Sequence, residues 1–397
     1  MRRIVPDVQR QGRFLFVLPP FAGHLMPAVT VGKELIRRGH DVTWATYPLV
    51  EELLPEAGGR RFFHSAFDIE DFLQAREASG GRWMAGLKAF WTDVMIPLTR
   101  EMRPQATDAI ADLRPDVVVA DQQAIAGALA ARRAGVPWAT SAATFAWASG
   151  VGAFPAVQGW IDEQLAALQR EAGLDPIAGP DLSRNLVLAY TTREFAGCQH
   201  DGGAFRYVGA PLDGREERGD FPWHLLDSRK KVFVSLGTVS HYRGAEFLRK
   251  VAATLDASMQ VIVAAPDGLL PDAPAHFIVR PWVPQLELLR RVDAIVCNAG
   301  FSTTGEALAL GVPVVAAPIA YDSSIVAERV VAAGAGIRVR FYRCTPEEIG
   351  EAVRQVLDEP SYQGAARALA DANARAGGAV AAADALESTF LGRGDRP

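Results

Sequence analysis

Short apolar runs alternate along the chain with longer segments whose apolar residues recur at helical spacing. The first run covers residues 14–18 and is bounded by glycine and proline, which is typical of a buried parallel strand. A helical segment follows, and we expect its helix to begin at Pro27 and to end at Gly39. Residues 41–46 form the next run. This order of strand, helix, glycine and strand predicts a βαβ unit.

The same alternation recurs in both halves of the chain. The further strands that it predicts cover residues 116–120, 231–236, 260–264, 294–297 and 312–318. Because strands and helices alternate throughout, we expect an α/β protein with two Rossmann-like, doubly wound domains. The predicted units are an N-terminal tail, a first domain, a charged and glycine-bearing linker, a second domain, and a C-terminal helix with a tail, at residues 1–12, 13–210, 211–230, 231–376 and 377–397.

The composition is that of an ordinary globular protein, with 49% hydrophobic and 22% charged residues in a chain of 397. A net charge of -5 argues against a nucleic-acid-binding protein, which would carry a basic face. The three cysteines are widely spaced and form neither a disulfide framework nor a zinc-binding pattern. Since the sequence also shows neither an apolar run of membrane-spanning length nor a signal peptide, we expect a cytoplasmic protein without a membrane span.

A histidine stands where open α/β sheets bind their ligands. Gly23 and His24 lie between the first strand and its helix, at the carboxyl end of the strand. Asp121 closes the strand over residues 117–120 at the same edge, and it could hold one ring nitrogen of His24 while the other accepts a proton. The helix N-terminus disfavours an imidazolium, so we expect a neutral His24. The alternative is a histidine that merely caps the helix.

The segment from Asn298 to Glu306 joins a strand end, a glycine turn and a helix start. Free backbone N–H groups and the helix dipole at such a point favour a phosphate, and Ser302, Thr303 and Thr304 add hydroxyl donors. An alternative stays open, because Thr303 and Glu306 also fit a capping box in which Glu306 only folds back on the backbone.

Two further segments offer groups for a nucleoside and a phosphate. Trp282 provides a flat indole face for a base, and Gln285 provides an amide that both donates and accepts hydrogen bonds. The alternative for Trp282 is an indole that fills a gap in the core. Ser235 and Thr238 lie where the first strand of the second half ends, and their loop is predicted to face a phosphate or an acceptor.

Together these segments resemble the UDP-glycosyltransferase family with the GT-B fold, and they are most similar to bacterial natural-product glycosyltransferases of the macrolide and enediyne type. The resemblance extends over residues 14–390 and is most specific over residues 281–322. It implies two Rossmann-like domains with a cleft between them and a C-terminal helix that crosses back.

The resemblance also implies a role for each candidate residue. His24 would deprotonate an acceptor hydroxyl, and Asp121 would balance the charge that forms on it. Trp282 would stack on the nucleobase with Gln285 beside the base and ribose. Glu306 would bind the ribose hydroxyls, which favours UDP over dTDP. The diphosphate would be held by Gly300, Ser302, Thr303 and Thr304.

The sugar and diphosphate positions show two departures from the family. Asp322 would bind hydroxyls of the transferred sugar, but Ser323 follows it where the family has glutamine. Asn298 stands where the family has a histidine that contacts the diphosphate, and it donates a hydrogen bond without a charge. Ser235 and Thr238 would line the cleft from the other side. The shorter Ser323 would lose a contact to a sugar hydroxyl. This favours the hypothesis that the donor carries a deoxysugar.

The implied reaction is an inverting, metal-independent transfer without a cofactor, in which the nucleotide sugar is a co-substrate. The sequence contains no Asp-x-Asp pair that would hold a divalent ion. The acceptor would be a hydroxyl of a hydrophobic natural-product aglycone, held by aromatic residues of two insertions near residues 60–100 and 145–175. The rings expected at this site are Phe67, Trp83, Phe90 and Phe145. The alternative is that these rings are ordinary core.

Other functions remain to be weighed against this one. A catalytically degenerate auxiliary protein that binds or activates a partner transferase is favoured by Asn298 and Ser323. It is opposed by the retention of His24, Asp121, Glu306 and Asp322. A nucleotide-sugar epimerase would need acid and base groups around the sugar C2, and we see no obvious set. An oxidoreductase is disfavoured because no Gly-x-Gly-x-x-Gly follows the first strand of either half. A homodimer and an auxiliary protein partner both stay open.

Overall fold

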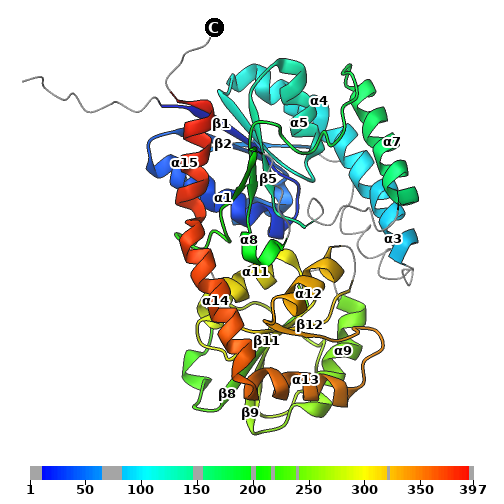
Figure 1. Ribbon diagram of the computed structural model, residues 1–397, viewed down its shortest axis with the longest axis vertical. Helices are drawn as coiled ribbons and strands as arrows, with labels where there is room; N and C mark the ends of the chain where they lie inside the picture. Colours follow the sequence, from blue (N-terminus) through cyan, green and yellow to red (C-terminus); the bar gives the residue numbers. More distant parts are fainter. Residues whose placement is uncertain are drawn as a thin grey trace, which may run out of the picture.

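The computed structural model describes residues 11–64, 83–145, 155–197, 203–215, 220–237, 241–319 and 322–392. This part of the chain forms two parallel sheets, each wrapped by helices and each built from one half of the sequence (Figure 1). Both sheets show the strand order of a doubly wound fold. The predicted α/β class with two Rossmann-like domains is therefore confirmed.

The first sheet has seven strands in the order β3-β2-β1-β4-β5-β6-β7. Their bounds are β1 Arg13–Val17, β2 Asp41–Thr46, β3 Gly59–Phe62, β4 Val117–Asp121, β5 Trp138–Ala142, β6 Val187–Ala189 and β7 Phe205–Tyr207. The surrounding helices are α1 Ala22–Arg37, α3 Trp83–Phe90, α4 Ile96–Leu113, α5 Ile125–Ala134, α7 Pro155–Glu171 and α8 Arg193–Ala196. Two shorter helical segments are the 3-10 turn η1 Pro48–Leu53 and the π-helical stretch η2 Trp91–Met95.

The second sheet has six strands in the order β10-β9-β8-β11-β12-β13. Their bounds are β8 Lys230–Ser235, β9 Met259–Ala264, β10 Phe277–Arg280, β11 Ala294–Cys297, β12 Val314–Ala316 and β13 Gly336–Arg338. The helices are α9 His241–Thr254, α10 Gln285–Leu289, α11 Phe301–Ala309, α12 Ser323–Ala332 and α13 Pro346–Asp358. The 3-10 turn η4 Trp223–Leu225 precedes this sheet.

The order of the strands sets where ligands bind. In the first sheet the chain builds outward from β1 through β2 and then starts again on the other side of β1 with β4. The second sheet repeats this reversal between β8 and β11. Such a switch point leaves a crevice at the carboxyl ends of the two central strands. Functional side chains are therefore expected after β1 and β4 in one domain, and after β8 and β11 in the other.

Helix α1 begins earlier than its proline suggests. We expected the helix to start at Pro27, but it starts at Ala22 and contains Pro27 in its second turn. A proline has no N–H, so the carbonyl of Gly23, four residues earlier, lacks its partner within the helix. In the structure this carbonyl accepts a hydrogen bond of 2.8 Å from the Ser302 hydroxyl of α11. The proline is tolerated because a residue of the other domain satisfies the freed group.

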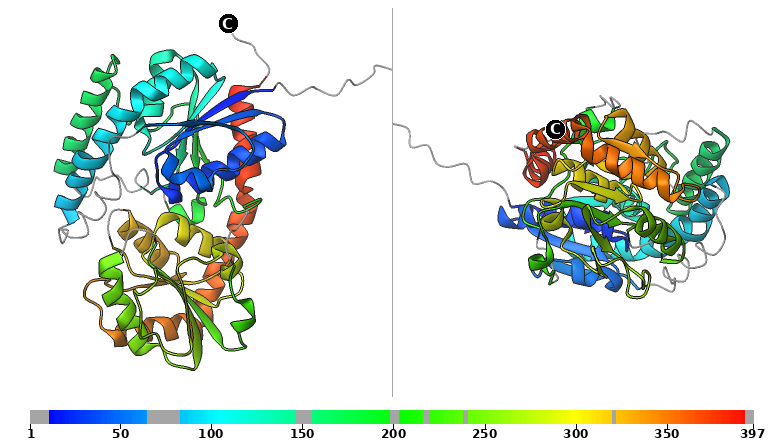
Figure 2. Two further views of the ribbon diagram at one scale, coloured as in Figure 1. Left: turned by 180° about the vertical axis from the view of Figure 1, so that it is seen from behind. Right: turned by 90° about the horizontal axis from the view of Figure 1, so that it is seen from below.

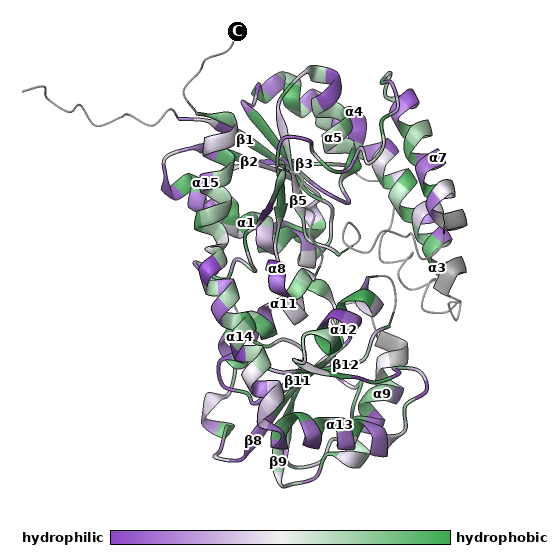
Figure 3. Cartoon of the chain, viewed as in Figure 1, coloured by the Kyte–Doolittle hydropathy of each residue, from purple (hydrophilic) through white to green (hydrophobic). Residues whose placement is uncertain are grey.

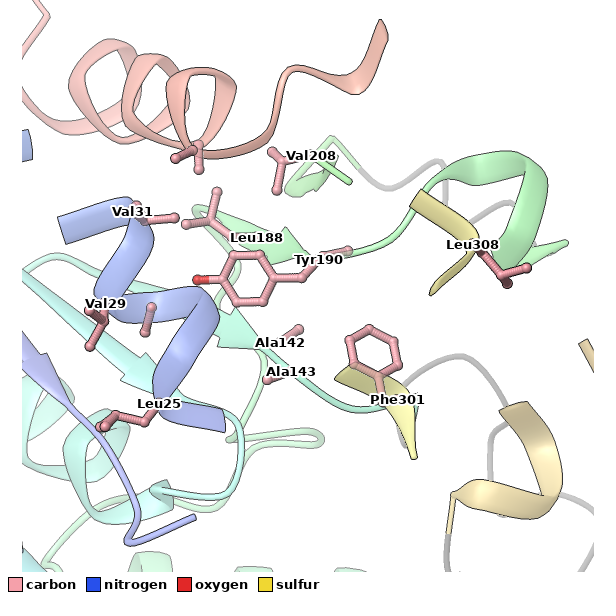
Figure 4. Close-up of a cluster of buried hydrophobic side chains, with 14 of the residues drawn as sticks. Leu25, Val29, Val31, Ala142, Ala143, Leu188, Tyr190, Val208, Phe301 and Leu308 are labelled. Carbon is pink, nitrogen blue, oxygen red and sulfur yellow. The ribbon is translucent and has the colours of Figure 1, made fainter. Parts of the chain in front are cut away.

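The two domains share one hydrophobic core where α1 and α11 meet. The close-up in Figure 4 shows Leu25, Val29 and Val31 of α1 on one side of this cluster, and Phe301 and Leu308 of α11 on the other. All five side chains are buried. Figure 3 shows that helices further out, such as α7, carry both hydrophobic and hydrophilic residues. Burial of apolar surface therefore stabilises the contact between the domains as well as each sheet.

Two helices at the end of the chain run along both domains. Helix α14 Pro360–Ala376 packs against α11, and α15 Gly378–Phe390 packs against α1. The chain bends between them at Gly377, whose φ of 85° lies in the left-handed region that glycine tolerates. Figure 2 shows from two further sides that the red and orange helices span from the second sheet to the first. The predicted C-terminal helix that crosses back is confirmed.

Candidate active site

His24 and Asp121 form a hydrogen-bonded pair at the switch point of the first sheet. His24 lies in the first turn of α1, rather than in a loop before the helix, and Asp121 is the last residue of β4. Nδ1 of His24 is 2.9 Å from Oδ1 of Asp121, and the same oxygen accepts a hydrogen bond from the backbone N–H of Gln123. A proton on Nδ1 satisfies the carboxylate, so Nε2 of a neutral His24 is the nitrogen that can accept a proton.

The electrostatic surroundings of His24 differ from what the helix N-terminus alone suggests. Burial is the largest single influence and disfavours the charged ring, but the charge and hydrogen bond of Asp121 and the charge of Asp322 together outweigh it. They raise the pKa of His24 above the ordinary value of 6.5. Oδ2 of Asp121 is also buried, and it has no hydrogen-bond partner in the described part of the chain. The helix N-terminus therefore does not alone set the pKa of His24, because both carboxylates favour the charged ring.

Glu306 lies in the second turn of α11, and both of its carboxylate oxygens have partners. Oε1 accepts a hydrogen bond from the guanidinium of Arg215, and Oε2 accepts one of 2.5 Å from the Gln285 amide. The capping-box alternative is wrong, because Gly300 occupies the N-cap position, so Thr303 lies inside the helix. Arg215 was not anticipated, since a charged linker gives no sign of which buried group one of its arginines will meet.

The turn before α11 brings Asn298 against the N-terminus of that helix. The side-chain oxygen of Asn298 accepts a hydrogen bond of 3.1 Å from the backbone N–H of Gly300. The N–H groups of the first helical turn lie beyond it and are the usual anion-binding donors. Ser302 and Thr303 are half-buried, whereas Thr304 is buried with Oγ1 3.8 Å from the sulfur of Cys297. The Thr304 hydroxyl therefore lies in the core.

The remaining nucleotide-side candidates fall around this turn. Trp282 is 56% exposed, so the alternative of a core-filling indole is wrong. Ser235 ends β8 and is paired in register with Cys297 at the end of β11, directly before the turn. Thr238 lies outside the described residues. The structure thus brings together Ser235, the turn and α11 at the switch point of the second sheet.

Asp322 reaches across to the first domain. It lies at the N-cap position of α12, where Ser323 is buried. Oδ2 of Asp322 accepts a hydrogen bond of 2.7 Å from the hydroxyl of Thr144, which follows β5. Together with the bond between Ser302 and Gly23, this contact shows that the carboxyl edges of the two sheets face each other. Candidate residues of both domains therefore lie along these facing edges.

The expected acceptor-binding aromatics have different environments. Phe145 is fully buried and packs edge-on against Phe195 and Phe301, with ring centroids 5.7 and 5.1 Å apart, so it is part of the core between the domains. Phe90 ends α3 and is half-buried against a cluster formed with α5 and α7. Phe67 and the side chain of Trp83 lie outside the part of the chain that is described.

In the described ranges, no group of three or more histidine, cysteine, aspartate or glutamate side chains converges as metal ligands would. None of the described helices combines the length and the apolar character that crossing a membrane requires.

Comparison with known proteins shows that the chain is similar to glycosyltransferases. Residues 227–373 match the family described as UDP-glucuronosyl and UDP-glucosyl transferase. The chain is 29% identical to 4'-demethylrebeccamycin synthase of Lentzea aerocolonigenes, over 94% of this chain and 99% of that protein. It is 27% identical to the NDP-glycosyltransferase YjiC of Bacillus subtilis, over 93% and 95%. The crystal structure of the glycotransferase of kitacinnamycin superimposes with a TM-score of 0.75 at 26% identity, covering 96% of this chain and 100% of that one.

Proposed function

The chain is a glycosyltransferase of the UDP-glycosyltransferase family with the natural-product type of GT-B fold, and from this premise we propose that it transfers a sugar from a nucleoside diphosphate to a hydroxyl of a hydrophobic aglycone. The observation that carries the proposal is the hydrogen bond between His24 and Asp121, which lies at the switch point of the first sheet and across the crevice from the N-terminus of α11. A base and an anion site on opposite walls are what this transfer needs.

In the proposed mechanism, His24 is the general base of an inverting displacement. Nε2 takes the proton of the acceptor hydroxyl as that oxygen forms a bond to C1 of the sugar. The bond between C1 and the diphosphate oxygen breaks on the opposite face, and its electron pair leaves with the nucleoside diphosphate. Asp121 stabilises the imidazolium that results, because its carboxylate lies 2.9 Å from Nδ1.

The charge on the leaving diphosphate is proposed to be stabilised by backbone N–H groups at the start of α11, without a metal ion. The half-buried Thr303 hydroxyl would add a hydrogen bond, whereas the single proton of the Ser302 hydroxyl is already donated to the Gly23 carbonyl. Asn298 lies against this turn and contributes no charge, so donor affinity depends more strongly on contacts to the nucleoside. The exposed indole of Trp282 and the carboxylate of Glu306 are proposed to provide them.

The proposed donor is a UDP-sugar in preference to a dTDP-sugar, since Glu306 would bind ribose hydroxyls. Asp322 would bind a hydroxyl of the transferred sugar next to the base, because its charge reaches His24. The side chain of Ser323 is buried, which supports the loss of one sugar contact and hence a deoxysugar as the group transferred.

The test is sugar transfer by the purified protein, followed by mass spectrometry, over a panel of UDP- and dTDP-sugars and hydrophobic aglycones. We expect a product that is heavier by one sugar residue, and H24A should lower turnover about 10²-fold or more. Turnover that is unchanged in H24A would remove His24 from the mechanism. The anomeric configuration of the product, read by NMR, tests inversion separately.

A second candidate, the auxiliary protein without its own activity, is favoured by one observation. Glu306 and Asp322, two of the side chains proposed to bind the donor, already have partners within the protein. Thermal melting with UDP, with dTDP and without nucleotide separates the candidates. A nucleotide at about 100 times its Kd adds roughly 2.7 kcal/mol to the free energy of unfolding. A shift supports the enzyme, and the absence of any shift supports the auxiliary protein.

A further inference from the structure

Two consecutive linker residues contact opposite domains. The backbone oxygen of Gly214 accepts a hydrogen bond of 2.7 Å from Nζ of Lys33, which lies on α1. The next residue, Arg215, donates from its guanidinium to Oε1 of Glu306 on α11. Gly214 has a φ of 69°, in the left-handed region that glycine tolerates. The turn is therefore built so that the linker contacts the helix of the proposed base on one side and the proposed ribose site on the other.

The pair of Arg215 and Glu306 is well shielded from water. Their side chains are 15% and 8% exposed, and Gln285 occupies the second carboxylate oxygen. Removing two charges from water is unfavourable unless each finds a partner of good geometry. With one donor on each oxygen, rotation of the carboxylate plane would break both hydrogen bonds. A carboxylate can accept about four hydrogen bonds, and Arg215 and Gln285 use two of these positions. The lone pairs that remain therefore have a defined direction.

We propose that Arg215 is a positioning residue that orients Glu306 toward the ribose of the donor and so sets the preference for a ribonucleoside diphosphate over a 2'-deoxyribonucleoside diphosphate. The inference rests on the proposed function, because it takes Glu306 as the group that binds the ribose. Arg215 acts through Glu306 and contacts none of the reacting atoms. A carboxylate held in one plane accepts from a hydroxyl at a defined place, and a nucleoside without that hydroxyl leaves the place unfilled.

Another arginine of the same linker provides a matched control. Arg229 pairs with Asp227 two residues away, and these side chains are 33% and 41% exposed. Replacing Arg229 removes a linker cation of the same kind without touching Glu306. A change that follows from R215M but not from R229M therefore belongs to the contact with Glu306 and not to the charge of the linker.

The experiment measures the Kd of UDP and of 2'-deoxyuridine diphosphate by titration calorimetry, in the full-length protein and its variants. This pair of probes differs only in the 2'-hydroxyl, so the ratio of the two Kd values reports its recognition. We expect the unmodified protein to prefer UDP by about 10- to 100-fold, as for a hydrogen bond to a charged group. R215M and E306Q should each reduce this ratio to within about threefold of 1, and R229M should leave it unchanged.

A second variant guards against a folding defect in R215M, which leaves a buried carboxylate without its partner. The double variant R215M/E306Q removes both charges and should fold normally. It should show the same low ratio as E306Q alone, because Arg215 acts only through Glu306. A preference for UDP that is restored in the double variant would overturn the proposal.

Three results separate this inference from the proposed function. If R215M weakens both nucleotides equally and keeps the ratio, Arg215 has a purely structural role and the inference is overturned. If the unmodified protein binds both nucleotides equally but still transfers a sugar, the inference is overturned and the function stands. If the unmodified protein binds neither nucleotide and transfers no sugar, the proposed function itself fails.

Discussion

His24 is the residue whose titration is most directly open to experiment. Its pKa lies above 6.5, because burial, which lowers it, is outweighed by Asp121 and Asp322. A general base works only when neutral, so kcat/KM should fall as the pH drops through this raised pKa. In D121N the Asp121 carboxylate no longer offsets the effect of burial, so the pKa of His24 falls. The decline of kcat/KM on the acid side, its acid limb, should therefore move to lower pH. The maximal rate should also fall, by about 10²-fold, because the imidazolium loses its counter-charge.

The measurement is kcat/KM against pH for the unmodified protein, D121N and D116N. Asp116 precedes β4 at the opposite edge of the sheet, where its carboxylate accepts a hydrogen bond from the backbone of Arg13. D116N should leave the acid limb where it is. An acid limb that D121N leaves in place, or moves to higher pH, would contradict the assignment of that limb to His24.

At the residue scale, the sequence predicted where the candidate side chains lie better than it predicted which groups surround them. The rule that ligands bind at strand carboxyl ends was enough to pair His24 with Asp121. It could not supply the charge of Asp322, which comes from the other domain, or the contact of Arg215 with Glu306, which are 91 positions apart. Contacts of this kind depend on how the two domains pack together, and the spacing of residues within one segment does not predict that packing.

At the scale of the element, Pro27 shows why the start of α1 was misjudged. Proline favours the first turn of a helix, so a proline after a strand is a reasonable start signal. Here it lies in the second turn, and the carbonyl of Gly23 is satisfied by Ser302 from α11. The strands were easier to predict, because continuous apolar runs mark buried parallel strands directly. Helix starts depend on partners that the local sequence does not contain.

The hydrogen bond from Ser302 to Gly23 predicts an energetic coupling between the two domains. S302A should lower the free energy of unfolding by about 1 kcal/mol, because the Gly23 carbonyl loses its hydrogen bond. In the P27A background the helix supplies its own N–H to that carbonyl, so S302A should matter less. Urea denaturation of the single variants and the double variant, without nucleotide, measures the difference.

S388A serves as the comparison for this cycle. The Ser388 hydroxyl donates to the carbonyl of Ala385 within α15, and the neighbouring Glu387 contacts Arg38 and His40, at the opposite end of α1 from Pro27. S388A should show no coupling to P27A. Additive effects of S302A and P27A, within about 0.3 kcal/mol, would mean that the freed carbonyl is satisfied in another way.

At the scale of the whole molecule, the two sheets were predictable and their joining was not. Alternating apolar runs and amphipathic segments suffice for two doubly wound domains. The contacts that hold the domains together come from distant segments, as where Asn373 of α14 accepts a hydrogen bond of 2.6 Å from the backbone of Ala210. The crossing of α14 and α15 was expected from the family resemblance, since an Ala-rich helical pattern does not reveal which surface it covers.

The docking of α15 on α1 relies on one shielded carboxylate. Glu387 accepts hydrogen bonds of 2.7 Å from both Arg38 and His40, and its side chain is 9% exposed. Asp384, one turn earlier on α15, also pairs with Arg38 but is 64% exposed. The same helix and the same arginine thus offer a buried and an exposed ion pair for comparison.

We expect E387Q to lower the free energy of unfolding by about 2 kcal/mol, because a half-buried arginine and a buried histidine lose a charged acceptor. D384N should lower it by less than about 1 kcal/mol, since water and salt screen an exposed pair. Thermal melting in low and high salt checks both values. The loss in E387Q should persist at high salt, whereas that in D384N should vanish. Equal losses in the two variants would show that α15 is held by its apolar face and that the shielded carboxylate contributes little to its docking.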